Sequence, residues 1–145
     1  MALHLIKLCV GCDSIQELKE WIDERLREKR RRGLAVEHVH TTRMLPKRRE
    51  ELLDGGSLYW VIRGELACRQ KLIDIRPIVD AEGVSRCQLV LAPKVMPVHP
   101  RGFRPFQGWR YLDDKDAPPD LTRKRSGVAG FPEPLRRELR ELGLL

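Results

Sequence analysis

The chain has 145 residues, of which 41% are hydrophobic and 34% are charged, and it carries a formal net charge of +7. This length and hydrophobic content fit a single domain over 1–145 that buries a core, and the positive balance favours an anionic partner. No apolar run reaches the roughly 18 residues that a membrane span needs, and the opening residues lack the long apolar stretch of a signal peptide. We therefore expect a cytoplasmic protein with no membrane partner, in which the cysteines are reduced or hold metal.

The first elements are predicted to be a strand and a helix. The strand covers residues 4–10, with these side chains on one face: Leu3, Leu5 and Lys7. Ser14 and Glu17 have the spacing of a capping box, in which each side chain satisfies a free backbone amide at a helix start. The basic residues 29–32 fall in the last turn, where cations favour the helix dipole, and Gly33 fits a left-handed cap. The apolar stripe at helical spacing consists of Ile15, Leu18, Ile22 and Leu26, widened by Trp21.

Strands dominate the middle of the chain. Arg63-Gly64 is predicted to make the tight turn of a hairpin, because glycine allows the positive φ angles that such turns need. A change in the inside–outside phase of the following strand predicts a bulge near residues 70–72. The predicted elements are a strand at 34–42, a turn at 44–47, a short basic helix at 47–53, strands at 57–62 and 65–75, a turn at 80–83 and a strand at 86–91.

The amino-acid composition changes in residues 93–134, which hold most of the nine prolines that follow Ile75. We expect an ordered loop here, because its aromatic side chains need a place to pack: Phe103, Phe106, Trp109, Tyr111 and Phe131. Residues 135–142 are predicted to form a final short amphipathic helix. These elements indicate an α+β fold, with a curved, mostly antiparallel sheet or small β-barrel and two or three flanking helices.

Four segments resemble a known family. They are His4-Leu5-Ile6-Lys7-Leu8, then Thr42-Arg43-Met44-x-Pro46-Lys47-Arg48, then Gly55-Gly56-Ser57-Leu58-Tyr59-Trp60-Val61-Ile62, and Arg104-Pro105-Phe106-Gln107-Gly108-Trp109-Arg110-Tyr111-Leu112. Together they look like an alphaproteobacterial family catalogued as domain of unknown function 1489, with a likeness that covers nearly the whole chain. The resemblance implies no particular activity, substrate or catalytic residue.

A second likeness, at the level of the fold, lies in residues 41–75. A Thr-Arg element, a proline, a short basic helix, a glycine pair and a hairpin of long strands resemble the small β-barrels called PUA-like, which include the ASCH and EVE groups. Several of these domains bind RNA or modified bases, and some ASCH proteins hydrolyse modified nucleosides. The ASCH signature Gly-x-Lys-x-x-Glu-x-Arg is absent here, so the likeness implies a fold and leaves the function open.

Basic residues are concentrated between Arg25 and Arg49. Ten of them stand against only Glu28 and Glu37, so this stretch carries the whole excess of positive charge. The residues predicted to neutralise phosphates, with an affinity that falls as salt rises, are Arg43, Lys47, Arg48 and Arg49. The alternative is a solvated face, and compensation of the dipole is enough to explain the cations at the helix end.

Aromatic residues beside basic ones are the second candidate feature, because they can stack unpaired bases while arginines hold the backbone. Trp60 alternates with Leu58 and Ile62, so we expect it in the core. Tyr59 belongs to the opposite face of that strand. The residues predicted to shape a base pocket are Tyr59, Arg104, Gln107, Trp109 and Arg110.

The cysteines leave three interpretations open. Cys9 and Cys12 have the spacing of half a zinc site, which Cys68 and Cys87 would complete if their strands were neighbours. A Cys-x-x-Cys pair between a strand and a helix also fits a redox role, and cysteine is a common small buried residue. We expect plain packing and no cofactor, with zinc on all four cysteines as the alternative.

No catalytic constellation is recognisable in the sequence. His38 and His40 share a strand face and can perform acid–base work, yet no nucleophile stands beside them at a recognisable spacing. We therefore expect a module that binds RNA or another phosphate-bearing ligand. The alternatives are a small hydrolase of a modified nucleoside, with a deep polar pocket near Thr42, Lys47 and Glu65, and a zinc-stabilised interaction protein.

Overall fold

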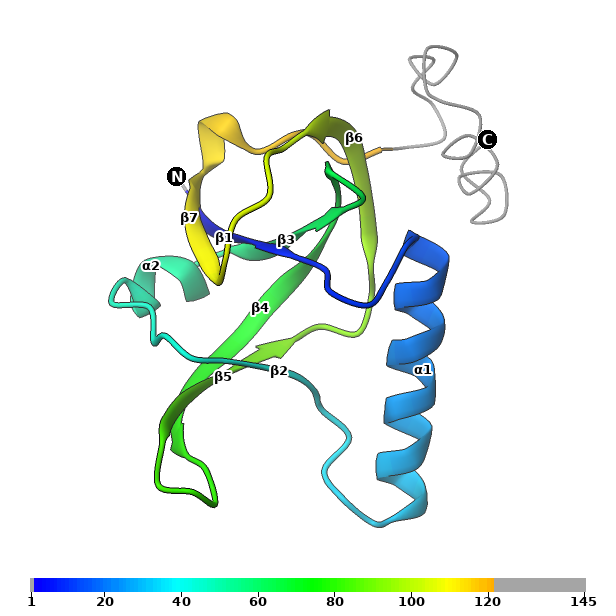
Figure 1. Ribbon diagram of the computed structural model, residues 1–145, viewed down its shortest axis with the longest axis vertical. Coiled ribbons are helices and arrows are strands. Elements are labelled where there is room, and N and C mark those ends of the chain that lie inside the picture. The colour runs from blue at the N-terminus through cyan, green and yellow to red at the C-terminus, as the bar shows by residue number, and fades with distance from the viewer. Residues whose placement is uncertain (1, 122–145) are drawn as a thin grey trace.

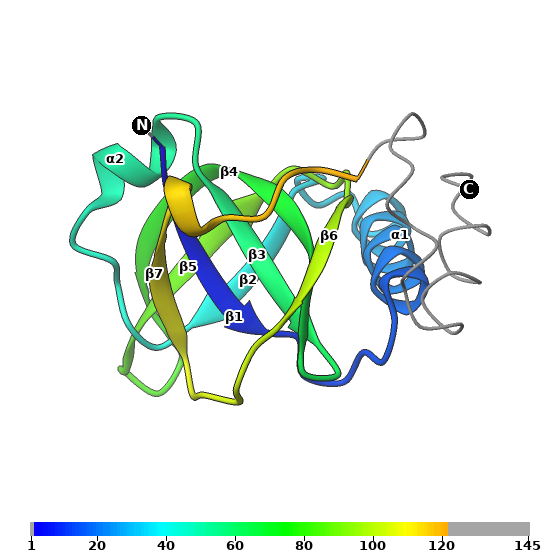
Figure 2. The same cartoon turned by 90° about the horizontal axis from the view of Figure 1, so that it is seen from above.

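The computed structural model describes residues 2–121. In chain order the elements are β1 (Leu3–Leu8), α1 (Ile15–Arg31), β2 (His38–Thr42), α2 (Arg49–Leu53), β3 (Ser57–Ile62), β4 (Glu65–Val79), β5 (Ser85–Leu91), β6 (Met96–Gly102), β7 (Trp109–Asp113) and the 3₁₀ turn η1 (Asp114–Asp116). The strands form one sheet in the order β2-β5-β4-β3-β1-β7, and β6 pairs with β4 outside this path. β1 and β3 run parallel, and the other named pairs are antiparallel. The predicted α+β class with a curved, mostly antiparallel sheet is confirmed (Figures 1 and 2).

α1 starts and packs as its sequence predicts. The Ser14 hydroxyl accepts a hydrogen bond from the Glu17 amide at 3.0 Å, and the Glu17 carboxylate accepts one from the Asp13 amide. Gly33 adopts a φ of +68° just after the helix, a conformation that glycine reaches without a steric cost. The predicted stripe is buried against the sheet: Ile15, Leu18, Ile22 and Leu26.

β4 is the longest strand and belongs to two parts of the sheet. Its first half pairs with β3 and β6, and its second half pairs with β5. The register shifts between Leu72 and Asp74, just beyond the bulge predicted near 70–72. The hairpin that joins β3 to β4 turns at Arg63 and Gly64, both with positive φ, which confirms the predicted tight turn.

Two hydrophobic clusters bury both faces of the central strands. The first core cluster joins α1 and α2 to one face of the sheet and includes Leu5, Leu18, Ile22, Leu52, Leu58, Trp60, Leu72, Ile75 and Leu89. The second core cluster lies on the other face and contains Ile6, Tyr59, Val61, Leu66, Val98, Phe106 and Leu112. Every residue of β3 is therefore buried, where simple alternation leaves one of its faces open.

The stretch after Pro93 is more regular than the predicted loop. It forms β6 and β7, and the backbone that follows is fastened to the sheet by charged side chains. The Arg69 guanidinium donates two hydrogen bonds of 2.7 Å to Asp120, and His4 lies 2.8 Å from the Asp114 carboxylate. The predicted helix at 135–142, and the part of the loop beyond residue 121, lie outside the described residues.

Two other predicted elements are shorter than expected. The strand at 34–42 begins only at His38, and the short helix at 47–53 begins only at Arg49. Neither α-helix in the described range combines the length and the apolar character that a bilayer crossing requires.

Candidate nucleic-acid interface

The basic segment that follows β2 is fastened to β7 by two aromatic side chains. The indole nitrogen of Trp109 donates a hydrogen bond of 2.8 Å to the carbonyl of Met44. The phenol oxygen of Tyr111 accepts from the backbone amides of Lys47 and Arg48, at 3.0 and 3.2 Å. The structure therefore places the two segments that carry most of the predicted site residues, 43–49 and 104–110, next to each other.

The basic side chains of this segment differ in their exposure and in their hydrogen-bond partners. Arg43 and Lys47 are exposed, and their side chains have no hydrogen-bond or ion-pair partner within residues 2–121. Arg48 forms a fork to Glu51, with distances of 3.1 and 2.6 Å, and lies 5.5 Å from the centre of the Tyr111 ring. This hydrogen-bonded pairing lowers the pKa of the Glu51 carboxyl, so the charge of Arg48 is partly balanced.

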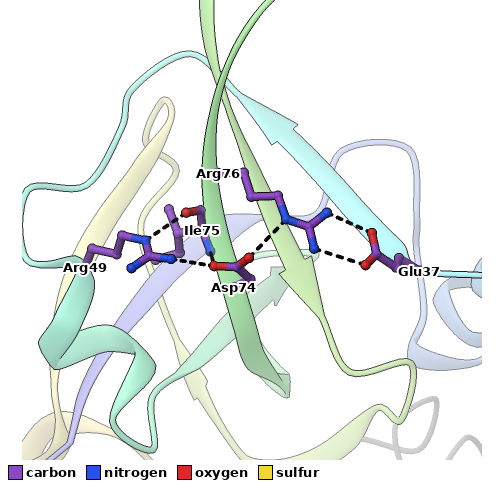
Figure 3. A network of polar contacts seen from close by, with 5 residues as sticks. All are labelled: Glu37, Arg49, Asp74, Ile75 and Arg76. Carbon is purple, nitrogen blue, oxygen red and sulfur yellow. Dashed lines mark hydrogen bonds and ion pairs between the residues drawn. The ribbon is translucent and has the colours of Figure 1, made fainter. Parts of the chain in front are cut away.

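Arg49 is held inside a network that joins three segments of the chain (Figure 3). Its guanidinium donates to the Asp74 carboxylate at 2.6 Å and to the Ile75 carbonyl at 2.9 Å, which fixes α2 to β4. Arg76 bridges Asp74 to both carboxylate oxygens of Glu37, ahead of β2. Hydrogen bonds from Arg76, from the Ile75 amide and from Arg49 lower the pKa of the Asp74 carboxyl. Arg49 thus already has structural partners, and the Asp74 carboxylate partly balances its charge.

The predicted base-binding residues differ in their availability. Arg104 and Gln107 are exposed on the loop before β7, and the Arg110 guanidinium lies 4.7 Å from the centre of the Phe106 ring. Trp109 is half-buried against the first core cluster. Tyr59 was predicted to stack a base, but it is only 4% exposed and belongs to the second core cluster, so its ring is not accessible to a base.

The four cysteines are not gathered into one site. Cys68 lies opposite Trp60 in the sheet, whereas Cys87 lies on β5 opposite Thr42 and Pro77. No cluster of three or more histidine, cysteine, aspartate or glutamate side chains in the described part of the chain is arranged to hold a metal ion. The thiols of Cys9 and Cys12 interact with each other, and burial is the main cause that raises the pKa of Cys9.

The residues named for a hydrolase pocket are also apart. Thr42 pairs with Cys87, which lies opposite Pro77 near the far end of β4. Glu65 is the first residue of β4 and pairs with Ile62 and Gly102. Since β4 separates these positions by a dozen residues, they do not line a common pocket.

A cavity of about 420 Å³ lies between the start of α1, the loop before it and strands β2 and β3. Its walls include Lys7, Trp21, His40 and Trp60; in the sequence His40 was considered for acid–base work and Trp60 was assigned to the core. One feature of the sequence indicates this cavity. Lys7 follows the apolar residues of the core-facing side of β1, so a cation stands where the pattern calls for a hydrophobic side chain.

Comparison with known proteins identifies a family and no nearer relative. No curated protein and no solved structure matches the chain. A family described as a protein of unknown function, DUF1489, matches residues 5–145, which is almost the whole chain. The protein therefore belongs to the DUF1489 family, as the four sequence segments predicted.

Proposed function

We propose that this protein is an RNA- or nucleotide-binding module that holds phosphates at the segment after β2. The observation that carries the proposal is the attachment of this segment to β7 by Trp109 and Tyr111. A loop that is already fixed loses less conformational entropy when it binds, so its cations bind an anion more effectively. The same attachment brings exposed aromatic and amide side chains close to those cations.

The cations do not contribute equally in this proposal. Arg43 and Lys47 are exposed and unpaired within residues 2–121, so they provide the main phosphate contacts. Arg48 is tied to Glu51 by its hydrogen-bonded fork and contributes less. The Arg49 guanidinium is hydrogen-bonded to Asp74 and Ile75 and fixes the start of α2 to β4 (Figure 3). Arg49 therefore serves as the control for the other three cations.

Two finer expectations belong to the same proposal. The protein acts in the cytoplasm, where RNA is available as a partner. Its curved sheet, the hairpin of long strands and the basic segment before them also support the PUA-like likeness drawn from residues 41–75. Zinc has no part in the proposal, and neither has catalysis.

The test is binding of transfer RNA at two salt concentrations. The wild-type protein is expected to bind with an affinity that falls steeply as salt rises, because each phosphate contact releases counterions. Replacing Arg43→Gln together with Lys47→Gln is expected to weaken binding about tenfold near physiological salt. The same pair should lower the slope of log affinity against log salt by about two, roughly one for each lost contact.

Arg49→Gln is the control, because it removes one positive charge from the same stretch of sequence, where the double variant removes two. It is expected to leave the salt slope unchanged, with circular dichroism used to confirm that every variant is folded. The proposal is wrong if the wild-type protein shows no salt-sensitive binding. It is also wrong if Arg49→Gln weakens binding and lowers the salt slope by half as much as the double variant does, because net charge alone would then explain the effect.

A further inference from the structure

The cavity beside α1 has the size of a ligand pocket. Its volume of about 420 Å³ falls within the range of roughly 300–1,000 Å³ that small-molecule sites occupy. Strands β1, β2 and β3 line one side of it, the first three turns of α1 line the other, and the loop of residues 9–12 joins the two sides (Figure 1). A pocket of this kind holds its side chains in place before a ligand arrives.

Two of the polar side chains that line the cavity, His40 and Lys7, are partly shielded from solvent. The Nε2 atom of His40 is buried and has no hydrogen-bond partner in the described part of the chain. Burial, followed by the charge of Lys7, lowers the pKa of His40 to about 4, so the imidazole is neutral at pH 7. Lys7 is half-buried, and desolvation lowers the pKa of its amine.

The remaining walls are aromatic and favour a flat ring. Trp60 lines the cavity but is only 3% exposed, and its indole nitrogen is hydrogen-bonded to Gln70 at 2.9 Å. The His40 ring lies 5.1 Å from that indole in an edge-to-face arrangement. Trp21 lines the outer side of the cavity from α1. An aromatic ligand gains stacking or edge contacts with such walls.

The mouth of the cavity disfavours phosphate. Glu20 and Glu24 are exposed on α1 and line the cavity, so they repel an anion at its entrance. The sheet connects this cavity to the basic segment. Lys7 is the cross-strand neighbour of Trp109, and Trp109 is bonded to Met44 beside Arg43. A ligand that spans both places therefore has an aromatic, uncharged end and a separate phosphate.

From this arrangement we propose that the cavity binds a nucleobase, with its ring against the exposed Trp21 and a carbonyl oxygen of the base accepting a hydrogen bond from Lys7. This proposal rests on the proposed function for its ligand class and adds where the base is recognised. The phosphate of the same nucleotide then lies toward Arg43 and Lys47.

The experiment uses two probes that separate the two ends of the ligand. Uncharged nucleosides (uridine, cytidine, adenosine and guanosine) test the cavity, and inorganic pyrophosphate tests the basic segment. The readout is the indole N–H signal of each of the three tryptophans in a ¹H–¹⁵N NMR spectrum. Trp21 and Trp60 line the cavity, while Trp109 reports on the segment through its bond to Met44.

At least one nucleoside is expected to shift the Trp60 and Trp21 signals in a saturable way, and Lys7→Met is expected to weaken its binding about tenfold. Lys71→Met, which removes an exposed lysine on β4, is expected to leave that binding unchanged. The spectrum itself shows whether each variant is folded. Absence of any saturable nucleoside shift, or equal binding by Lys7→Met, overturns the base pocket. Failure of pyrophosphate to bind while a nucleoside binds instead removes the phosphate site and leaves the base pocket standing.

Discussion

At the scale of single residues, the two histidines of β2 are the groups whose ionisation the fold changes most clearly. His38 is buried beside Trp21, and His40 is packed edge-on against Trp60. Burial is the main cause that lowers the pKa of each imidazole to about 4, and neighbouring cations add to it. Arg25 acts on both rings, Lys29 on His38, and Lys7 on His40. The native fold therefore holds both rings neutral, whereas the unfolded chain protonates them at their ordinary pKa.

This difference predicts how stability depends on pH. Between about pH 6.5 and pH 4 the unfolded chain binds more protons than the native protein, so the free energy of unfolding falls as the pH falls. Each imidazole contributes a slope on the order of 1 kcal/mol per pH unit in this window. The lowered pKa values of Asp74 and Glu37 remove stability only below their ordinary values near pH 4, so they do not explain a slope above pH 5.

Urea unfolding at pH 7, 6 and 5 measures this slope. His40→Phe keeps an aromatic ring against Trp60 and removes one titrating group, so it is expected to reduce the slope by about half. A free energy of unfolding that stays constant from pH 7 to pH 5 contradicts the assignment.

At the scale of elements, the junction between α2 and β3 depends on a close backbone approach at Gly56. Its amide donates to the Leu52 carbonyl at 2.9 Å, which ends the short helix. A Cβ atom at this position meets the Leu52 carbonyl oxygen at 2.2 Å and the Leu3 carbonyl oxygen at 2.3 Å. Both are backbone atoms, so neither moves without displacing α2 or β1. Only glycine allows these two elements to pack at this distance.

Gly56→Ala is accordingly expected to destabilise the protein by about 3 kcal/mol, because the added methyl group forces α2 and β1 apart. Thermal or urea unfolding gives the value. Gly102→Ala is the matched control, since a Cβ atom at Gly102 meets nothing within 4 Å, and it is expected to change stability by less than about 0.5 kcal/mol. Equal effects of the two substitutions contradict the close approach at Gly56.

At the scale of the whole molecule, the sheet is curved, and side chains of the strand at one end reach the segment that follows the strand at the other end. β2 and β7 stand at opposite ends of the strand order, yet the segment after β2 is bonded to Trp109 and Tyr111 of β7 (Figure 2). Proximity of these ends positions the candidate interface, because the basic segment and the aromatic loop come from opposite edges of the sheet. The curvature of the sheet therefore both shapes the fold and assembles the candidate site.

Tyr111→Phe tests this closure, because it removes only the oxygen that accepts from the Lys47 and Arg48 amides. It is expected to cost about 1 kcal/mol of stability and to speed hydrogen exchange at these two amides. The amide of Glu17, bonded to Ser14 on the distant helix cap, serves as the internal control and is expected to exchange as in the wild-type protein. Unchanged exchange at Lys47 and Arg48 means that the phenol does not hold the segment.

Local patterns in the sequence determined the elements whose stabilising contacts are close along the chain. The capping box at Ser14, the apolar stripe of α1 and the tight turn at Arg63 were all predicted, because each depends on neighbours within a few residues. The motifs that carry the family likeness, and the curved antiparallel sheet, were also evident from the sequence.

Contacts between distant residues were decided only by the tertiary structure. Sequence spacing does not show that Arg49 meets Asp74, 25 residues later, or that the Trp109 indole reaches Met44, 65 residues earlier. It does not show that a second cluster covers Tyr59, or that Lys7 and His40 face one cavity, because burial depends on what the rest of the chain packs above each position. Whether a cation is free for a ligand or neutralised by a carboxylate is a property of three-dimensional distance, and the sequence alone contains no record of that distance.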